Sequence, residues 1–276
     1  RNRVLSLANG NAPRLTTPVN ANFAVPTFVT QVGDPIGRFL LYETTGVFQT
    51  WEEVYAAPKQ NTPLGADGKP LLPQTNVTQQ TSPGDLKFRD VDGNGIIDPN
   101  DRVVVGKIIP DFTWGMTHEV SFKGLSLSVF LLGVQGVDIY NGLRSSQERA
   151  NLTVANFSRS LLDSWRPDNP STTLPRAILQ DPNFNNRAST RFLEDGSFVR
   201  VKNVRLAYNL PAALLSRVKL STAQLYFSGV NLLTFTKYTG LDPELGNQNQ
   251  AAEIGNYDAG QYPVSKQYVV GLKLGF

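Results

Sequence analysis

A segment of twelve residues combines acidic, amide and glycine residues at a spacing that suits a hard cation. Numbered from its first Asp, it has oxygen-bearing side chains at positions 1, 3, 5, 9 and 12, which are Asp90, Asp92, Asn94, Asp98 and Asp101. Gly95 occupies position 6, where a sharp turn is needed, and the Ile96 carbonyl at position 7 would supply a further oxygen. Because Ca²⁺ takes six to eight oxygen ligands, the segment predicts a calcium site.

Two features separate this segment from an ordinary EF-hand loop. Asp101 stands where a bidentate Glu is usual, and its shorter reach should weaken binding or favour a smaller ion such as Mg²⁺. The flanking residues 84–88 and 102–105 read as extended chain and not as helices. The alternative is a turn rich in Asp, Asn and Gly that holds no ion, but clustered carboxylates repel one another without a cation. We therefore expect a structural ion that ties down the loop 84–109, with no donor left over for catalysis.

The last residues of the chain predict a strand with two chemically different faces, because side chains alternate across a strand. One side holds Tyr268, Val270, Leu272, Leu274 and Phe276. The other side, apart from Val269, holds polar or small residues: Gln267, Gly271, Lys273 and Gly275. A strand that ends on an aromatic residue in this way is typical of a membrane β-barrel, whose outer face meets lipid.

The same alternation recurs in four earlier segments, 112–122, 125–131, 198–210 and 225–235. Lys123 and Gly124 predict a tight hairpin turn between the first two segments. Within 198–210 the alternation shifts by one residue at Lys202 and Asn203, which predicts a β-bulge. A soluble antiparallel sandwich with one buried face would give the same signal in each strand, so alternation alone leaves both classes open.

The connections between the predicted strands differ in length in a way that favours the barrel. The short ones are 123–124 and 211–221, and the long ones are 51–110, 137–195 and 237–264. Outer-membrane barrels have short periplasmic turns and long extracellular loops, so this asymmetry predicts that the C-terminus lies on the periplasmic side. A single helix is predicted inside the second long connection, over 152–165.

Composition excludes several classes of protein. No run approaches the roughly 20 apolar residues of a membrane-spanning helix. The chain has no Cys, which excludes disulfides and thiolate-held metals. Its net charge of +3 comes from scattered basic residues, which argues against nucleic-acid binding. With one His, His118 inside an apolar strand pattern, and no phosphate loop or nucleophile elbow, we expect no enzyme activity.

Seven phrases follow one another along the chain in a characteristic order and spacing. They are Pro35–Phe39 with Tyr42 and Gly46–Gln49, Gly84–Asp98 with Asp101 and Arg102, Pro110–Gly115, Leu127–Gly136, Glu194–Asn203, Asn231–Glu244, and the terminal strand ending at Phe276. As an ordered set they resemble the C-terminal part of the SusC/RagA family of TonB-dependent outer-membrane transporters from Bacteroidetes. The resemblance covers almost the whole chain and is densest over 84–276.

The resemblance implies an all-β fold in which residues 1–276 supply about the last seven or eight strands of a 22-stranded transmembrane barrel with long extracellular loops. It implies import of oligosaccharides or peptides in the bacterial outer membrane, beneath a SusD-like lipoprotein. It also implies energy from TonB–ExbB–ExbD through a plug and TonB box that lie outside these residues, so we expect the chain to be part of a longer protein. In such a family the terminal strand is also an assembly signal, here Gly271, Leu274 and Phe276, with Val269 where a polar residue is usual.

Two other functions fit the same sequence. A barrel of this ancestry could be a structural subunit of a larger outer-membrane assembly for secretion or protein insertion. A secreted, calcium-stabilised β-sandwich that binds glycans is the soluble alternative. Four loop aromatics are candidates for stacking on a sugar or peptide: Trp165, Tyr238, Tyr257 and Tyr262. An interfacial aromatic girdle or ordinary loop packing is the favoured explanation for each of them.

Overall fold

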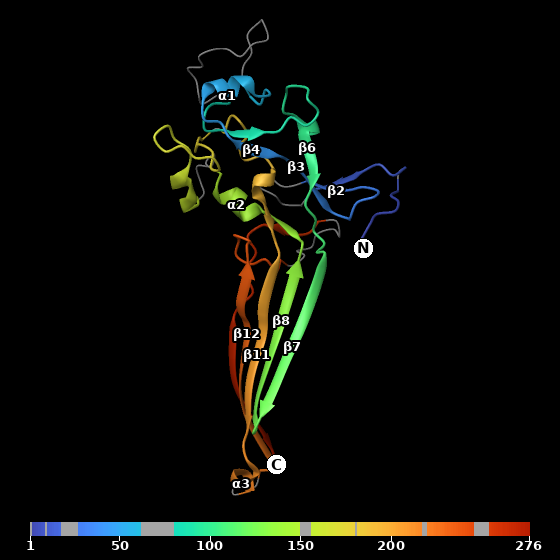
Figure 1. The fold of residues 1–276 in the computed structure, drawn as a ribbon, viewed down its shortest axis with the longest axis vertical. Helices are drawn as coiled ribbons and strands as arrows, with labels where there is room; N and C mark the ends of the chain where they lie inside the picture. The colour runs from blue at the N-terminus through green and yellow to red at the C-terminus, as the bar shows by residue number, and fades with distance from the viewer. Residues whose placement is uncertain are drawn as a thin grey trace. The chain divides into compact units, whose positions relative to one another are not determined.

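The computed structural model describes residues 2–8, 10–17, 27–61, 80–149, 156–179, 181–216, 220–245 and 254–276. Strands dominate it (Figure 1), which confirms the all-β prediction. The strands are β1 (Arg14–Thr16), β2 (Thr27–Thr30), β3 (Arg38–Tyr42), β4 (Thr44–Val47), β5 (Leu86–Phe88), β6 (Arg102–Val105), β7 (Phe112–Phe122), β8 (Leu125–Gln135), β9 (Asp138–Asn141), β10 (Leu193–Asp195), β11 (Phe198–Asn209), β12 (Thr222–Thr236), β13 (Tyr257–Asp258) and β14 (Gln267–Gly275).

The helices within the described residues are all short. They are α1 (Trp51–Ala56), α2 (Gly142–Gln147) and α3 (Ala212–Leu215), with 3₁₀ turns η1 (Pro99–Asp101), η2 (Arg159–Asp163) and η3 (Thr190–Phe192). None of them is long and apolar enough to cross a membrane. The helix predicted over 152–165 is wrong in its described part, which holds only η2. The hydroxyl oxygen of Ser158 accepts from both the backbone N–H and the hydroxyl of Ser160 there, and such local bonds compete with helix formation.

The chain forms two compact units. The first comprises Arg1–Ile108, Ile139–Glu194 and Gly246–Gly260, and the second comprises Ile109–Asp138, Asp195–Leu245 and Gln261–Phe276. Three small sheets form the first unit, in the orders β1-β2-β3-β6, β10-β9-β13 and β4-β5. Its larger hydrophobic cluster joins strands of two of these sheets and contains Phe28, Phe39, Leu41, Tyr140, Phe192 and Ile254.

The second unit is a five-stranded antiparallel sheet in the order β14-β12-β11-β8-β7. Its β7–β8 hairpin turns at Lys123 and Gly124, as predicted, and both have the positive φ that a type I′ turn requires. The predicted bulge is also present, because the register of β11 with both of its neighbours shifts between Val201 and Asn203. Lys202 is therefore the extra residue, and the strand changes its alternation at that point.

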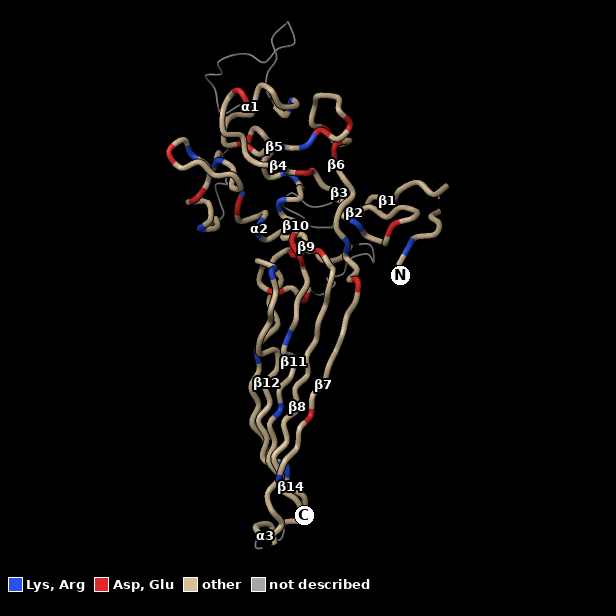
Figure 2. Tube along the Cα trace, viewed as in Figure 1, with Lys and Arg blue, Asp and Glu red and all other residues tan. Residues whose placement is uncertain are grey.

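The two faces of this sheet differ sharply in polarity, because directly paired residues point to the same side. Charged residues are sparse along the five strands (Figure 2), whose residues are all described. All of them lie on one face or in the bulge: Glu119, Arg200, Lys202, Arg205 and Lys273. The opposite face, called the apolar face below, carries exposed side chains on every strand, among them Met116, Val120, Phe122, Leu125, Leu127, Leu206, Tyr208, Leu225, Phe227, Tyr268, Val270 and Leu272.

Candidate functional site

Backbone N–H groups hold the carboxylates of the acidic loop in fixed positions. The Asp90 carboxylate accepts hydrogen bonds from Gly93 N (2.7 Å) and Gly95 N (2.8 Å). The bond from Gly95 is the main reason that the pKa of Asp90 lies below its ordinary value, so this side chain is anionic at neutral pH. Asp101 is buried and accepts from Val91 N and Asp98 N, both at 2.7 Å, which closes the loop on itself.

Three of the predicted ligands converge. Asp90, Asp92 and Asp101, at loop positions 1, 3 and 12, each offer one carboxylate oxygen, and these oxygens lie within 4.8 Å of one another. Two oxygens that bind the same Ca²⁺ at about 2.4 Å are at most about 4.8 Å apart, so the three carboxylates fit one ion. Asp98 is outside this group, and its Oδ1 accepts from Asn100 N (2.7 Å) and caps η1. The amide oxygen of Asn94 accepts from the N–H of Ile96 (2.7 Å).

The middle of the acidic loop packs against, and is hydrogen-bonded to, other parts of the first unit. Ile97 is buried in the smaller hydrophobic cluster with Val47, Leu86 and Phe88. The backbone of Lys59 donates to the carbonyl of Gly95 (2.8 Å) and accepts from Ile97 N (2.9 Å). The strands on either side are extended, as predicted, since β5 precedes the loop and β6 follows η1. The loop is therefore held at both ends and in the middle.

Arg187 is a cation close to this loop that the sequence analysis missed. Its guanidinium stacks on the rings of Phe88 (4.4 Å), Tyr42 (4.9 Å) and Phe184 (5.6 Å). Burial lowers the pKa of Arg187, while attraction to Tyr42, Asp181 and Asp101 opposes this effect. Arg187 thus places positive charge near Asp101, one of the three converging carboxylates. It follows an Asn-rich stretch 86 residues after Asp101, where no local sequence pattern indicates that it lies near the loop.

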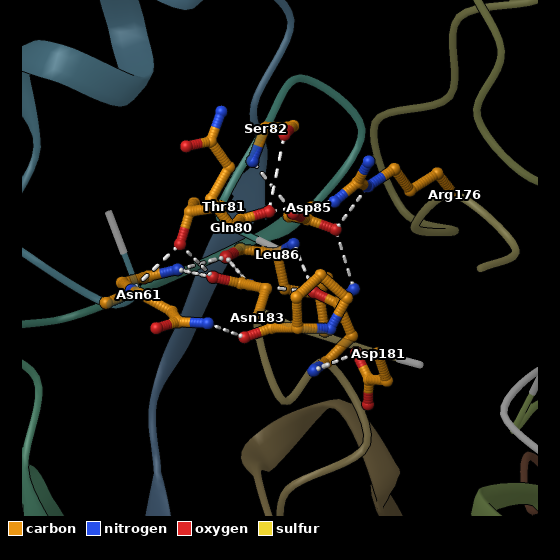
Figure 3. A network of polar contacts seen from close by, with 12 residues as sticks. Asn61, Gln80, Thr81, Ser82, Asp85, Leu86, Arg176, Asp181 and Asn183 are labelled. Atoms are coloured by element: carbon orange, nitrogen blue, oxygen red, sulfur yellow. Dashed lines mark hydrogen bonds and ion pairs between the residues drawn. The ribbon is translucent and has the colours of Figure 1, made fainter. Parts of the chain in front are cut away.

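A buried polar network, also missed, holds β5 in place (Figure 3). Its centre is Asp85, which is fully buried and forms two hydrogen bonds with Arg176, Nε to Oδ1 at 2.7 Å and an Nη to Oδ2 at 2.8 Å. Asn185 Nδ2 and Ser82 N donate to the same carboxylate at 2.8 and 2.9 Å. Burial is the main influence on the pKa of Asp85 and raises it, and the guanidinium opposes that rise.

Side-chain amides extend this network along β5. Gln60 accepts from Phe88 N (2.7 Å) and donates to the Leu86 carbonyl (2.8 Å). Its side chain therefore makes the backbone hydrogen bonds that a neighbouring strand would otherwise make. Asn183 Nδ2 donates to the same carbonyl at 3.0 Å. Asn185 accepts from Leu86 N at 2.8 Å. The strand that leads into the acidic loop is therefore positioned by side chains from 60, 183 and 185 as well as by β4.

The three residues of the predicted assembly signal lie on or just after β14. Gly271 pairs with Tyr226 of β12, and a Cβ built on Gly271 would lie only 2.2–2.5 Å from atoms of the Tyr226 ring. Leu274 belongs to the apolar face and is 43% exposed, and Phe276 is 94% exposed. Gly271 therefore has a packing role within the sheet, whereas Leu274 and Phe276 present their side chains outward.

The four aromatic candidates do not form one stacking surface within either unit. Trp165 is half-buried in the first unit, where it packs on the smaller hydrophobic cluster and donates to Gln49 Oε1 (3.0 Å). Tyr257, in the same unit, packs near Tyr140 with ring centres 6.1 Å apart. In the second unit Tyr238 is only 5% exposed, so the expectation that it contacts substrate conflicts with its burial. Tyr262, at 98% exposed, is fully available.

No family model matches the chain, but individual proteins do. TonB-dependent receptor P3 of Formosa agariphila is 31% identical over 281 residues, which cover 100% of this chain and 26% of that protein. TonB-dependent receptor P26 of the same organism is 34% identical over 70% of this chain and 20% of its own length. TonB-dependent receptor SusC of Bacteroides thetaiotaomicron is 26% identical over 68% of this chain and 17% of its length.

Solved structures of RagAB also match almost the whole chain. The RagAB peptide transporter matches with 28% identity and a TM-score of 0.68, over 99% of this chain and 26% of the matched chain. The RagAB peptide importer in its open-open state matches with 27% identity and a TM-score of 0.67. The fold and the sequence therefore define a segment of a TonB-dependent receptor. The chain belongs to the SusC/RagA family of TonB-dependent receptors, and it spans about a quarter of the length of the relatives it matches.

Proposed function

We propose that this chain forms part of an outer-membrane β-barrel that imports oligosaccharides or peptides in a TonB-dependent way. The main support for this proposal is that the charged residues of the five-stranded sheet lie away from its apolar face. Soluble proteins rarely expose a continuous apolar surface larger than a few hundred Å². Here such side chains cover one face of five strands, while all the strand charges lie on the opposite face or in the bulge. Lipid outside and a polar lumen inside account for both faces.

Strand length supports a membrane-spanning role. The strands β7 and β8 have 11 residues each. At about 3.4 Å per residue and a tilt of about 45°, they rise about 26 Å, close to the apolar band of outer-membrane barrels. Within the described residues β7 and β14 are each paired on one side only. Unpaired edges are costly in lipid, so the partners that complete them would be other strands of the same barrel, around its plug.

The remaining parts of the proposal rest on the unequal lengths of the strand connections, for orientation, and on the TonB-dependent relatives, for partners and energy. In this proposal the C-terminus is periplasmic, a SusD-like lipoprotein covers the extracellular side, and TonB–ExbB–ExbD supplies energy through residues outside this chain. No catalytic step is part of this function. The two RagAB structures are described as a peptide importer and a peptide transporter, which supports oligopeptides as one substrate class.

Uptake by the full-length receptor tests the function. Cells with and without the receptor gene would be given fluorescent peptides and oligosaccharides of graded length, in the presence and absence of a protonophore. We expect receptor-dependent uptake that stops when the proton-motive force is removed. Outer-membrane location without any uptake would favour a structural subunit of a larger assembly, and a receptor that stays soluble without detergent would favour the glycan-binding sandwich.

We also propose that the acidic loop binds Ca²⁺, with Mg²⁺ as the competing ion, through the convergence of Asp90, Asp92 and Asp101. The side chain of Asn94 and the Ile96 carbonyl are the nearest further donors in the sequence, and Asp98 could act through water. The ion would neutralise the cluster and stiffen the loop 84–109. It would not take part in transport itself.

Removal of the ion should loosen the loop and leave the barrel folded. In the purified full-length receptor, chelation should increase protease cleavage within 84–109, while the heat-resistant migration of the folded barrel stays unchanged. Asp92→Asn should weaken Ca²⁺ binding by roughly tenfold or more, since it removes one of three converging charges. Asp168→Asn, an exposed carboxylate elsewhere in the first unit, is the matched control. Identical cleavage with and without chelator would count against an ion.

A further inference from the structure

Arg200 on β11 is buried, although other charged residues on the same face of the sheet are exposed. It pairs with Leu132 of β8 and Thr234 of β12. This register puts it on the same side as Glu119 and Arg205, the polar face, where both of those residues are exposed. Arg200 itself is only 2% exposed. Something therefore covers the polar face at this end of the sheet, and the cover must neutralise a buried guanidinium.

The cover is the segment 237–245, which follows β12. Asp242 and Glu244 both accept hydrogen bonds from the guanidinium of Arg200, at 2.5 and 2.6 Å. Thr234 Oγ1 accepts from Arg200 Nε at 2.9 Å. Glu244 also accepts two hydrogen bonds from Lys202 Nζ, at 2.8 and 2.9 Å. Two cations of β11 thus meet two carboxylates of the segment, and the group is neutral as a whole.

Asp242 also joins the two ends of the connection between β12 and β14. One of its oxygens accepts from Glu244 N at 2.9 Å, and the other accepts from Val264 N at 3.1 Å. Residue 264 lies just before β14. A single carboxylate therefore ties β11, the start of the connection and its return together. In the same segment Tyr238 is buried and lies against Gly240.

We propose that segment 237–245 is a size-selecting element of the import path, folded onto the lumen side of the sheet and held there by a clamp of Arg200, Lys202, Asp242 and Glu244. The segment lies over the polar face, at the end of the sheet where β12 leads into the connection to β14. In the proposed barrel the polar face lines the lumen, so the segment would narrow the lumen at that end. This part rests on the proposed import function. The clamp itself rests on the distances above and can be tested separately.

The clamp is tested by distance measurement on the full-length receptor in detergent. Spin labels on Ser221→Cys and Leu241→Cys report the position of the segment relative to the far end of β12. Both positions are exposed, and the 276 residues contain no other Cys. We expect one narrow distance distribution in the parent and one about twofold broader in Asp242→Asn. The buried guanidinium would keep only one of its two carboxylate partners, so it would draw in water and release the segment.

Two further variants keep this test decisive. Glu244→Gln alters a partly exposed member of the clamp and should broaden the distribution even if Asp242→Asn fails to assemble. Glu43→Gln breaks an exposed ion pair with Arg89 in the first unit and should change nothing. A distribution in Asp242→Asn or Glu244→Gln as narrow as that of the parent would overturn the clamp.

Size selection is tested by uptake of peptides and oligosaccharides of graded length. Release of the segment should raise uptake of the longest members severalfold relative to the shortest. An unchanged ratio in a variant with a broadened distribution would overturn the selection role. Absence of energy-dependent uptake in the parent would instead overturn the import function, while the distance measurement would still decide the clamp.

Discussion

Replacement of Arg176 by Met should lower the free energy of opening around β5 by about 3–5 kcal/mol, because it leaves the buried carboxylate of Asp85 without its cation. Asp85 is fully buried and Arg176 is 11% exposed, so water cannot replace the lost bonds without entering the core. Hydrogen exchange of the full-length receptor would measure the effect, as faster exchange in residues 80–88 and 174–187. Arg166→Met, which removes an exposed ion pair with Asp168, should cost at most about 1 kcal/mol.

The deficit of Arg176→Met should depend on pH in a predictable direction. Burial raises the pKa of Asp85 above its unfolded value, and loss of the guanidinium raises it further. Such a group favours the folded state when protonated, and the benefit is lost as the pH rises through the folded pKa. The deficit should therefore be smallest in acid and grow toward neutral pH. Adding Asp85→Asn should recover part of the stability at neutral pH, and no recovery would argue against a buried charge as the cause.

Substitution of Gly271 by Ala should reduce the amount of folded receptor in the outer membrane by destabilising the β12–β14 pair by about 1–3 kcal/mol. The added Cβ would collide with the Tyr226 ring, which lies across the glycine and also stacks on Arg205 at 4.7 Å. Heat-modifiable migration of the unheated receptor would quantify the folded fraction. Gly115→Ala is the matched control, because its Cβ would come no closer than 3.1 Å to any neighbour, the nearest being the ring of Phe130.

A second substitution distinguishes the packing of Gly271 within the sheet from recognition of the terminal strand as an assembly signal. Tyr226→Ser should restore the folded fraction of Gly271→Ala, since it removes the ring that causes the collision. Phe276→Ala should also lower the folded fraction, but its side chain is 94% exposed, so Tyr226→Ser should not rescue it. Unchanged surface levels of Phe276→Ala would discredit the assembly-signal interpretation.

The long strands were predictable because each is specified by its own residues. Alternation placed β14 nearly to the residue and found 225–235 of β12, and the phase shift in 198–210 marked the bulge at Lys202. The failure over 152–165 has a local cause, since serine side chains bond to the backbone in place of a helical ladder. The division into two units was not predictable, because it depends on contacts between segments far apart in sequence.

The site was predictable only where its residues are neighbours in sequence. Asp90, Asp92 and Asp101 converge as their spacing required, because the turn geometry of twelve residues is local. The surrounding groups come from remote segments: Asp85 meets Arg176 across 91 residues, and Arg200 meets Asp242 across 42. A single sequence gives each of these residues many possible partners, and only the fold chooses among them.

The extra residue at Lys202 has a consequence for protein engineering. Arg200 and Arg205 are five positions apart, an odd interval that would send them to opposite sides of a regular strand. They share a side only because the bulge resets the phase. Chimaeras of related receptors joined within 198–210 must therefore preserve this one-residue offset. Deletion of a single residue there would turn one of the two guanidinium groups onto the apolar face.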